Sequence, residues 1–104
     1  MPLPEFVMEK LIDALAVVVA RLDNWGASMM SAHNREWMRR GQAAVLSRDE
    51  TEVRRCLAEC ALVLDELADA KDDRGNLRPL ELAHEALTLV HRVETAHLNR
   101  KAWA

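Results

Sequence analysis

The chain has 104 residues, of which half are hydrophobic and 30% are charged, so it suits one small globular domain and is too apolar for a disordered one. Its net charge of −3 and isoelectric point near 5.8 argue against bulk attraction to nucleic acid or to an anionic membrane. Only three glycines and three prolines interrupt it, and strand-forming aromatic residues are almost lacking. The composition therefore predicts an all-α domain.

The first predicted helix runs from about Pro4 to Asp23. Its apolar residues recur at helical spacing and cover more than half of the circumference: Val7, Met8, Leu11, Ile12, Leu15, Val18, Val19 and Leu22. Phe6 and Val17 fall instead among polar residues when the helix is projected at 100° per residue. Because a monomeric bundle would expose both side chains, we predict that they lie in a homodimer interface. Gly26 is placed to end this helix.

The second predicted helix runs from about Ala27 to Ser47. Its inner line comprises Met30, His33, Trp37, Gly41 and Ala44. The sequence leaves open whether the helix bends at His33–Asn34. It also leaves open whether the methionines and tryptophans near its start are core residues or an adaptable binding face. On this second interpretation Met29 and Met30 belong to an interaction surface.

The third predicted helix begins at the segment Ser47-Arg48-Asp49-Glu50, which matches the capping-box pattern with Ser47 as the cap. This start predicts a tight hairpin with the preceding helix. The expected core seam comprises Val53, Cys56, Leu57, Cys60, Leu64 and Leu67. The charged residues are ordered against the helix macrodipole: Arg54 and Arg55 come first, and Asp65, Glu66 and Asp69 come last. That order indicates pairing with another helix, a second subunit or a partner protein.

The fourth predicted helix runs from about Pro79 to Lys101, after a charged loop over residues 71–76. Its apolar residues form two lines, and a stripe that wide packs against two neighbouring helices. Four helices of about 20 residues are each about 30 Å long. Their similar lengths predict a single up-down-up-down four-helix bundle.

The two cysteines, Cys56 and Cys60, are four residues apart on the third predicted helix. A straight helix holds such a pair side by side without giving disulfide geometry. We therefore expect reduced core thiols in a reducing compartment. Because the N-terminus lacks the basic region of a secretory signal and no apolar run approaches the roughly 20 residues that span a bilayer, we expect a cytoplasmic protein without a membrane partner.

The hairpin between the second and third helices resembles one tetratricopeptide repeat, whose pattern is W-x2-L-G-x2-Y followed by A-x3-F. Trp37, Gly41 and Leu57 match the pattern, whereas Arg40 and Ala44 replace its leucine and tyrosine. Repeats of this family stack on neighbouring copies, and the chain holds no second copy. We interpret the match as a generic helical hairpin.

Two segments of the fourth helix have the Glu-x-x-His spacing of di-iron carboxylate bundles: Glu81 with His84, and Glu94 with His97. Such a centre requires these motifs on facing helices, and here both lie on one helix, 13 residues apart. We therefore predict no metal and no cofactor.

Arg92 and His97 have an Arg-x4-His spacing that resembles the all-α HEPN ribonucleases. The resemblance implies that the two side chains activate a ribose hydroxyl and stabilise a phosphorane. In that family a polar residue usually follows the arginine, whereas this chain has Val93.

The sequence favours a non-enzymatic protein–protein interaction module, such as an adaptor, a small chaperone or an inhibitor or regulator, that acts through helical surfaces. The predicted surface comprises Phe6, Val17, Met29, Met30, Arg35, Arg39, Arg40, Asp65, Glu66 and Asp69. The alternative is a nucleic-acid-linked protein, either an RNase that uses Arg92 and His97 or a binder that uses the three arginines of the second helix. No catalytic residue is assigned, and the partner protein is not identified by the sequence.

Overall fold

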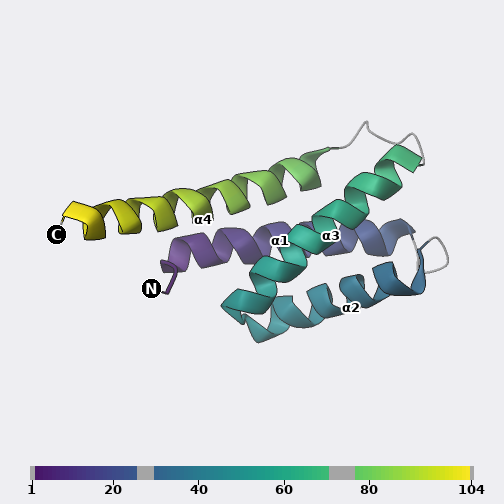
Figure 1. The fold of residues 1–104 in the computed structure, drawn as a ribbon. Helices are drawn as coiled ribbons and strands as arrows, with labels where there is room; N and C mark the ends of the chain where they lie inside the picture. Colours follow the sequence, from purple (N-terminus) through teal and green to yellow (C-terminus); the bar gives the residue numbers. More distant parts are fainter. Residues whose placement is uncertain (1, 26–29, 71–76, 104) are drawn as a thin grey trace.

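The computed structural model describes residues 2–25, 30–70 and 77–103, with side chains described up to residue 100. Four helices account for nearly all of them: α1 (Glu5–Trp25), α2 (Ala32–Ser47), α3 (Glu50–Ala70) and α4 (Arg78–Trp103) (Figure 1). None of the described residues forms a strand. The predicted all-α, up-down-up-down four-helix bundle is confirmed, and the bounds predicted for α1 and α4 agree with the observed ones to within two residues.

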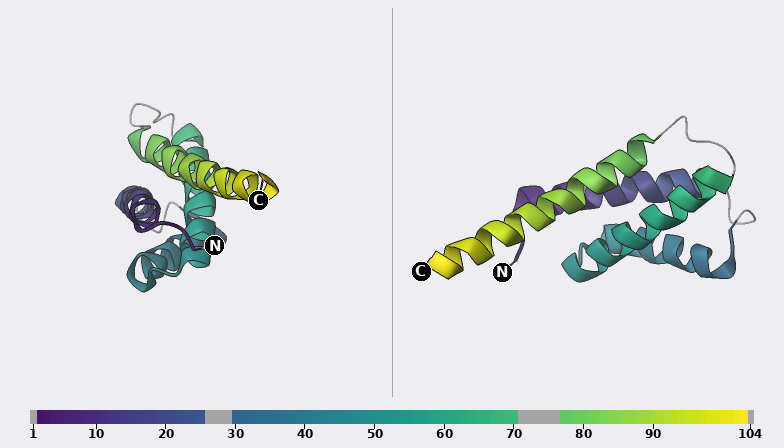
Figure 2. Two further views of the ribbon diagram at one scale, coloured as in Figure 1. Left: turned by 90° about the vertical axis from the view of Figure 1, so that its left-hand side faces the viewer. Right: turned by 45° about the horizontal axis from the view of Figure 1, so that its top comes forward.

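The helices pack as a central pair with one helix on each side. α1 and α3 contact each other across the middle of the bundle, and both also contact α2 and α4. Seen end-on, α2 and α4 lie on opposite sides of the α1–α3 pair, and the outward side of α1 is uncovered (Figure 2). The molecule measures 53 × 27 × 20 Å because α4 extends past the other helices at its C-terminal end.

The start of α2 differs from the sequence prediction. Ser31 is the N-cap, and its hydroxyl accepts a hydrogen bond of 3.1 Å from the Asn34 backbone N–H. The helix therefore begins at Ala32 rather than near Ala27, because a serine side chain there satisfies one of the free amides of the first turn. His33–Asn34 is that first turn and not a bend. Gly26 and Met29 lie outside the described residues, as does the predicted loop over 71–76.

The α2–α3 connection is two residues long, which confirms the tight hairpin but not its predicted cap. Arg48 has the left-handed conformation, φ 58° and ψ 24°, and its N–H donates to the Ala44 carbonyl at 3.0 Å. Ser47 is therefore the last residue of α2. Asp49 caps α3, and its carboxylate accepts from the Glu52 N–H at 2.9 Å. Because Arg48 separates the two helices, the cap falls two residues later than the capping-box pattern predicts.

The core is formed by the inner faces of α1 and α3, with smaller contributions from α2 and α4. All but one of the predicted seam residues of α3 are buried, and Leu67 is half-buried. Gly41 brings α2 close to its neighbours, because a Cβ atom at this position would lie 2.8 Å from Cγ2 of Val19 and 3.2 Å from Sγ of Cys60. Only a glycine permits that approach.

The methionines and tryptophans that the sequence left unassigned belong to the core where they are described. Met30 is 5% exposed, so the prediction that it lies on an interaction surface is wrong. Met38, Trp25 and Trp37 are half-buried and pack against the core. His33, which was expected on the inner line, is exposed and meets the Trp37 ring edge-on at a centroid distance of 6.4 Å. The driving force is burial of large apolar surfaces.

α4 is packed along only part of its length. Its buried residues are Pro79, Ala83, Ala86 and Val90. None of its described side chains after Val90 is buried, and Leu98 is 64% exposed. The latter part of the helix extends past the neighbouring helices (Figure 2).

Candidate interaction surfaces

An apolar hollow of about 340 Å³ lies between α3 and α4. Its lining comprises Ala58, Ala61 and Leu62 of α3 with Leu80, Ala83, His84 and Leu87 of α4. The three alanines carry single methyl groups, so the space between the two helices is not filled by side chains. Leu62 stands at the edge of this hollow with 58% of its surface exposed.

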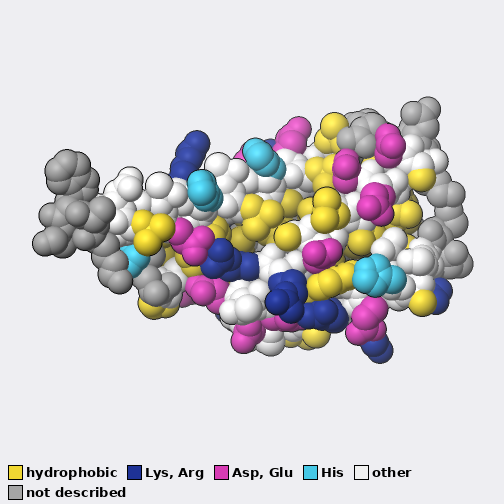
Figure 3. All heavy atoms as spheres, viewed as in Figure 1, with side chains coloured by type: hydrophobic (Ala, Val, Ile, Leu, Met, Phe, Trp, Pro, Cys, Tyr) yellow, Lys and Arg dark blue, Asp and Glu magenta, His cyan; other side chains and the backbone are white. Residues whose placement is uncertain are grey.

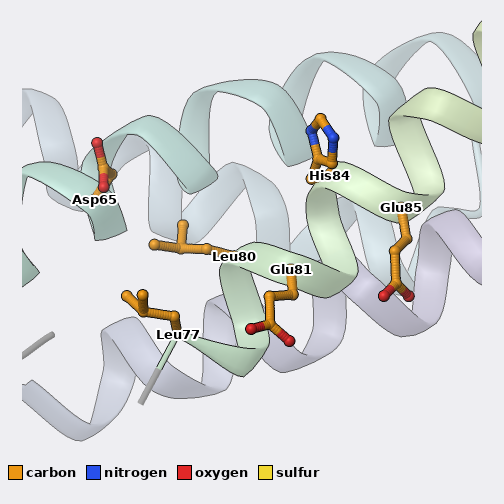
Figure 4. Close-up of a pocket in the computed structure, with 6 residues that line it drawn as sticks. All are labelled: Asp65, Leu77, Leu80, Glu81, His84 and Glu85. Carbon is orange, nitrogen blue, oxygen red and sulfur yellow. The ribbon is translucent and has the colours of Figure 1, made fainter. Parts of the chain in front are cut away.

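A second hollow, of about 460 Å³, continues the first toward the start of α4. Leu80 and His84 line both hollows, so the two hollows adjoin each other along α4. In the close-up, Leu77 and Leu80 point toward Asp65 of α3, whereas Glu81 and Glu85 carry their carboxylates along one side of α4 (Figure 4). We name the combined feature the α3–α4 groove.

The Leu77 end of the α3–α4 groove is acidic. Asp65, Glu66 and Asp69 are exposed on the last turns of α3, and Asp65 lines the same hollow as Glu81 and Glu85 of α4. The Arg78 guanidinium lies 3.3 Å from Glu81 and 3.4 Å from Glu85. Acidic side chains accordingly surround hydrophobic ones where α3 ends and α4 begins (Figure 3).

The basic half of α3 has a partner within the chain. The Arg54 guanidinium donates two hydrogen bonds to the Glu94 carboxylate of α4, at 3.0 and 3.3 Å. This bidentate pair explains why an arginine stands near the N-terminus of α3 although the macrodipole disfavours it there. It also joins α4 to α3 just beyond the last buried residue of α4.

A second surface lies on α1, on the side opposite the core. Phe6 is 59% exposed and Val17 is 38% exposed, which confirms that a single copy of the chain leaves both uncovered. Lys10 and Asp13 lie between them and are also exposed. A hollow of about 130 Å³ separates this face from α4 and is lined by residues of both helices: Lys10, Asp13, Ala14, Val17, Leu82, Glu85 and Ala86. We name Phe6, Lys10, Asp13 and Val17 the outer face of α1.

The three arginines that sequence reasoning grouped on α2 have different surroundings. Arg35 is exposed. Arg39 pairs with Glu36 one turn away on the same helix. Arg40 donates to Glu52 of α3 at 2.9 Å, and its guanidinium lies 4.3 Å from the centroid of the Trp37 ring. The hydrogen bond from Arg40 holds the pKa of the Glu52 carboxyl below its ordinary value. Arg39 and Arg40 are therefore both paired with carboxylates within the chain.

The short motifs of α4 do not converge on a reaction site. Glu81 and Glu94 are each bound by an arginine, and no group of three or more metal-ligating side chains occurs among the described residues. Arg92 and His97 are separated by about 140° around the helix axis. Arg92 lines a shallow hollow together with Lys10 and Thr88, and His97 does not line that hollow.

The two thiols are buried and free, as the sequence predicts. Cys56 donates to the Glu52 carboxylate at 3.5 Å, and Cys60 donates to the Trp37 carbonyl at 3.3 Å. Burial raises the pKa of Cys56 to about 11 and that of Cys60 to about 12. Both thiols stay protonated near neutral pH, which makes them poor nucleophiles.

Sequence reasoning included Asp65, Glu66 and Asp69 but missed the apolar part of the groove beside them. Leu80 and Leu87 fell within the broad apolar stripe of the fourth predicted helix, and Leu62 lay outside the predicted seam of the third. The available signal was the set of small residues on both helices, since Ala58, Ala61 and Ala83 limit how far the space between helices is filled. That signal has meaning only once the two helices are known to be neighbours.

No protein-family model matches this sequence, and no curated protein or solved structure shows significant similarity to it. Among the helices of the described residues, none combines the length and the apolar character needed to cross a membrane.

Proposed function

We propose that this protein is a non-enzymatic protein–protein interaction module, an adaptor, small chaperone or inhibitor, that binds an amphipathic helix of its partner in the α3–α4 groove. The observation that carries the proposal is the pair of adjoining hollows between α3 and α4, with the exposed Leu62 in the lining of one of them. A groove between two helices accepts the apolar face of a third helix. The side chains of that third helix would fill the space that the three alanines leave open.

The charge of the groove specifies the chemistry of the partner. Asp65, Glu81 and Glu85 line its Leu77 end, and Glu66 is exposed on the same last turns of α3. A helix with lysine or arginine beside its apolar face would meet opposite charges there, which favours its orientation and its rate of association. The proposed partner segment is therefore a basic amphipathic helix.

The same proposal includes the quaternary state and the location of the protein. Two copies form a homodimer through the outer face of α1, and the dimer acts in the cytoplasm. The four residues of the outer face of α1 do not line the α3–α4 groove, and Glu85 lies between the two surfaces, so one surface is proposed to bind a partner while the other holds the second copy.

The groove is tested with a designed 18-residue helical peptide that has leucines on one face and lysines beside them, compared with the same peptide carrying glutamates instead of lysines. We expect calorimetry to show binding of the lysine peptide and at least about tenfold weaker binding of the glutamate peptide, with a difference that shrinks as salt is added. Leu62→Glu should weaken binding of the lysine peptide at least about tenfold.

The matched control is Leu46→Glu, which places the same charge on a leucine of α2 that is 85% exposed and lies outside the α3–α4 groove. It should bind the lysine peptide as the natural chain does. If the Leu62→Glu variant binds the lysine peptide as tightly as the natural chain does, the α3–α4 groove is not the binding site. Binding of random RNA at low salt that is lost on Arg92→Ala would favour the nucleic-acid alternative instead.

A further inference from the structure

The outer face of α1 has a regular spacing. Phe6, Lys10, Asp13 and Val17 follow one another at intervals of four, three and four residues, so they lie along one line of the helix. The line spans about 16 Å along the helix axis. It lies opposite the residues that α1 buries in the core, on the side where no other helix covers α1 (Figure 2).

This spacing is self-complementary when the helix is read in reverse. Two copies of α1 can lie antiparallel about a two-fold axis that passes between residues 11 and 12. In each pair of facing residues, the two residue numbers then add up to 23. Phe6 then faces the partner's Val17, and Lys10 faces the partner's Asp13. The symmetry repeats each contact, which gives two apolar pairs at the ends and two ion pairs in the middle.

We propose that two copies of this protein associate through their α1 helices in this antiparallel register. The inference rests on the homodimer included in the proposed function and specifies its geometry. Neither Lys10 nor Asp13 forms an ion pair with another described residue, and Arg48, whose charge Asp13 also feels, pairs with Glu5 and Glu9 instead. In a parallel register Lys10 would face Lys10 and Asp13 would face Asp13, which repel each other.

The surroundings of Val17 give the incoming phenylalanine a place to pack. The hollow between α1 and α4 places Ala14, Leu82 and Ala86 beside Val17. In the antiparallel register this hollow lies next to Phe6 of the partner subunit. The ring therefore covers apolar surface of α4 as well as of α1, and burial of that surface favours association.

The register is tested by reversing one charge at a time. Lys10→Glu leaves only acidic residues at the two central positions, and Asp13→Lys leaves only basic ones. Each variant alone converts two attractive pairs into two repulsive ones, so its dimer should be weaker by about tenfold or more in sedimentation equilibrium. When the two variants are mixed, every central pair again joins opposite charges, and native mass spectrometry should show a one-to-one heterodimer.

Two further variants make the result specific. Lys10→Glu combined with Asp13→Lys in one chain restores opposite charges across the two-fold axis and should restore the homodimer. Arg100→Glu reverses an exposed charge on α4 away from this face and should leave the dimer unchanged. Circular dichroism checks that each variant keeps the helix content of the natural chain.

The outcomes separate this inference from the rest of the proposed function. A natural chain that stays monomeric at high concentration would overturn the homodimer and its register together. A dimer that neither single reversal weakens, or a mixture that forms no heterodimer, would overturn the register alone. Peptide binding in the α3–α4 groove is measured independently, so it stands or fails by itself.

Discussion

α2 and α4 flank the same central pair of helices but are held in different ways. α2 is joined to α3 by two residues, is packed closely through Gly41, and is tied to α3 by the Arg40–Glu52 pair. α4 buries four residues in its first half and none of its described side chains after Val90. α2 therefore lies on a closely packed side of the bundle, and α4 lies on a side with accessible apolar surface.

Small residues have opposite effects on the two sides. Gly41 allows α2 to pack closely on α1 and α3, because side chains of these two helices occupy the space where a side chain at position 41 would lie. Ala58, Ala61 and Ala83 leave a groove, because α4 packs mainly on α1 and does not close onto α3. A small side chain favours close packing only where the neighbouring helix is free to approach.

Filling the close contact on the α2 side should have the largest effect. Gly41→Leu adds four carbon atoms where even the first would lie 2.8 Å from Val19, so we expect a loss of about 3 kcal/mol in the free energy of unfolding, measured by urea denaturation. Ala43→Leu adds a similar side chain on the exposed face of α2 and should change stability by less than about 0.5 kcal/mol. Equal effects of the two variants would contradict the close packing at Gly41.

The buried thiols next to that contact should have an intermediate effect. Replacing both Cys56 and Cys60 with alanine leaves small cavities and should lower the free energy of unfolding by about 1–3 kcal/mol in total. Urea denaturation at pH 7 measures the change. Binding of the lysine peptide by the folded variant should be unchanged, since neither thiol lines the α3–α4 groove.

The same thiols predict how stability depends on pH. Their pKa values rise from an ordinary value of 9.0 to about 11 and about 12, so above pH 9 the unfolded chain loses these protons before the folded chain does. Stability contributed by the protonated thiols is therefore fully present below pH 9 and declines as the pH rises toward 12. The variant with both cysteines replaced should show a smaller decline over that range, and an identical decline would contradict the burial of the thiols.

The smallest effect should come from the far part of α4. Leu98→Ala should change the free energy of unfolding by less than about 0.5 kcal/mol, because Leu98 is 64% exposed. Val90→Ala, two turns earlier on the same helix, removes a side chain that is 2% exposed and should cost about 2 kcal/mol. If Leu98→Ala proves as costly as Val90→Ala, the latter part of α4 must be covered in solution, for example by a second copy.

Much of this fold follows from local pattern. The apolar spacing predicted four helices, the α3 seam, and the exposure of Phe6 and Val17, because each depends on which side of one helix a residue occupies. The same logic did not predict the first residue of α2 or the cap of α3. Ser31, Ser47 and Asp49 are all able to cap a helix, and the left-handed backbone of Arg48 decided between the last two.

The sequence by itself determined the helices and the order of charges along them. The tertiary structure decided which charges pair, such as Arg40 with Glu52 and Arg54 with Glu94, and whether apolar residues such as Met30 and Leu62 are buried or exposed. Helical periodicity is a property of one segment, whereas the distance between two helices depends on the side chains of all the helices that meet there. For that reason the outer face of α1 can be derived from the sequence, and the α3–α4 groove appears only when α1, α3 and α4 are packed together.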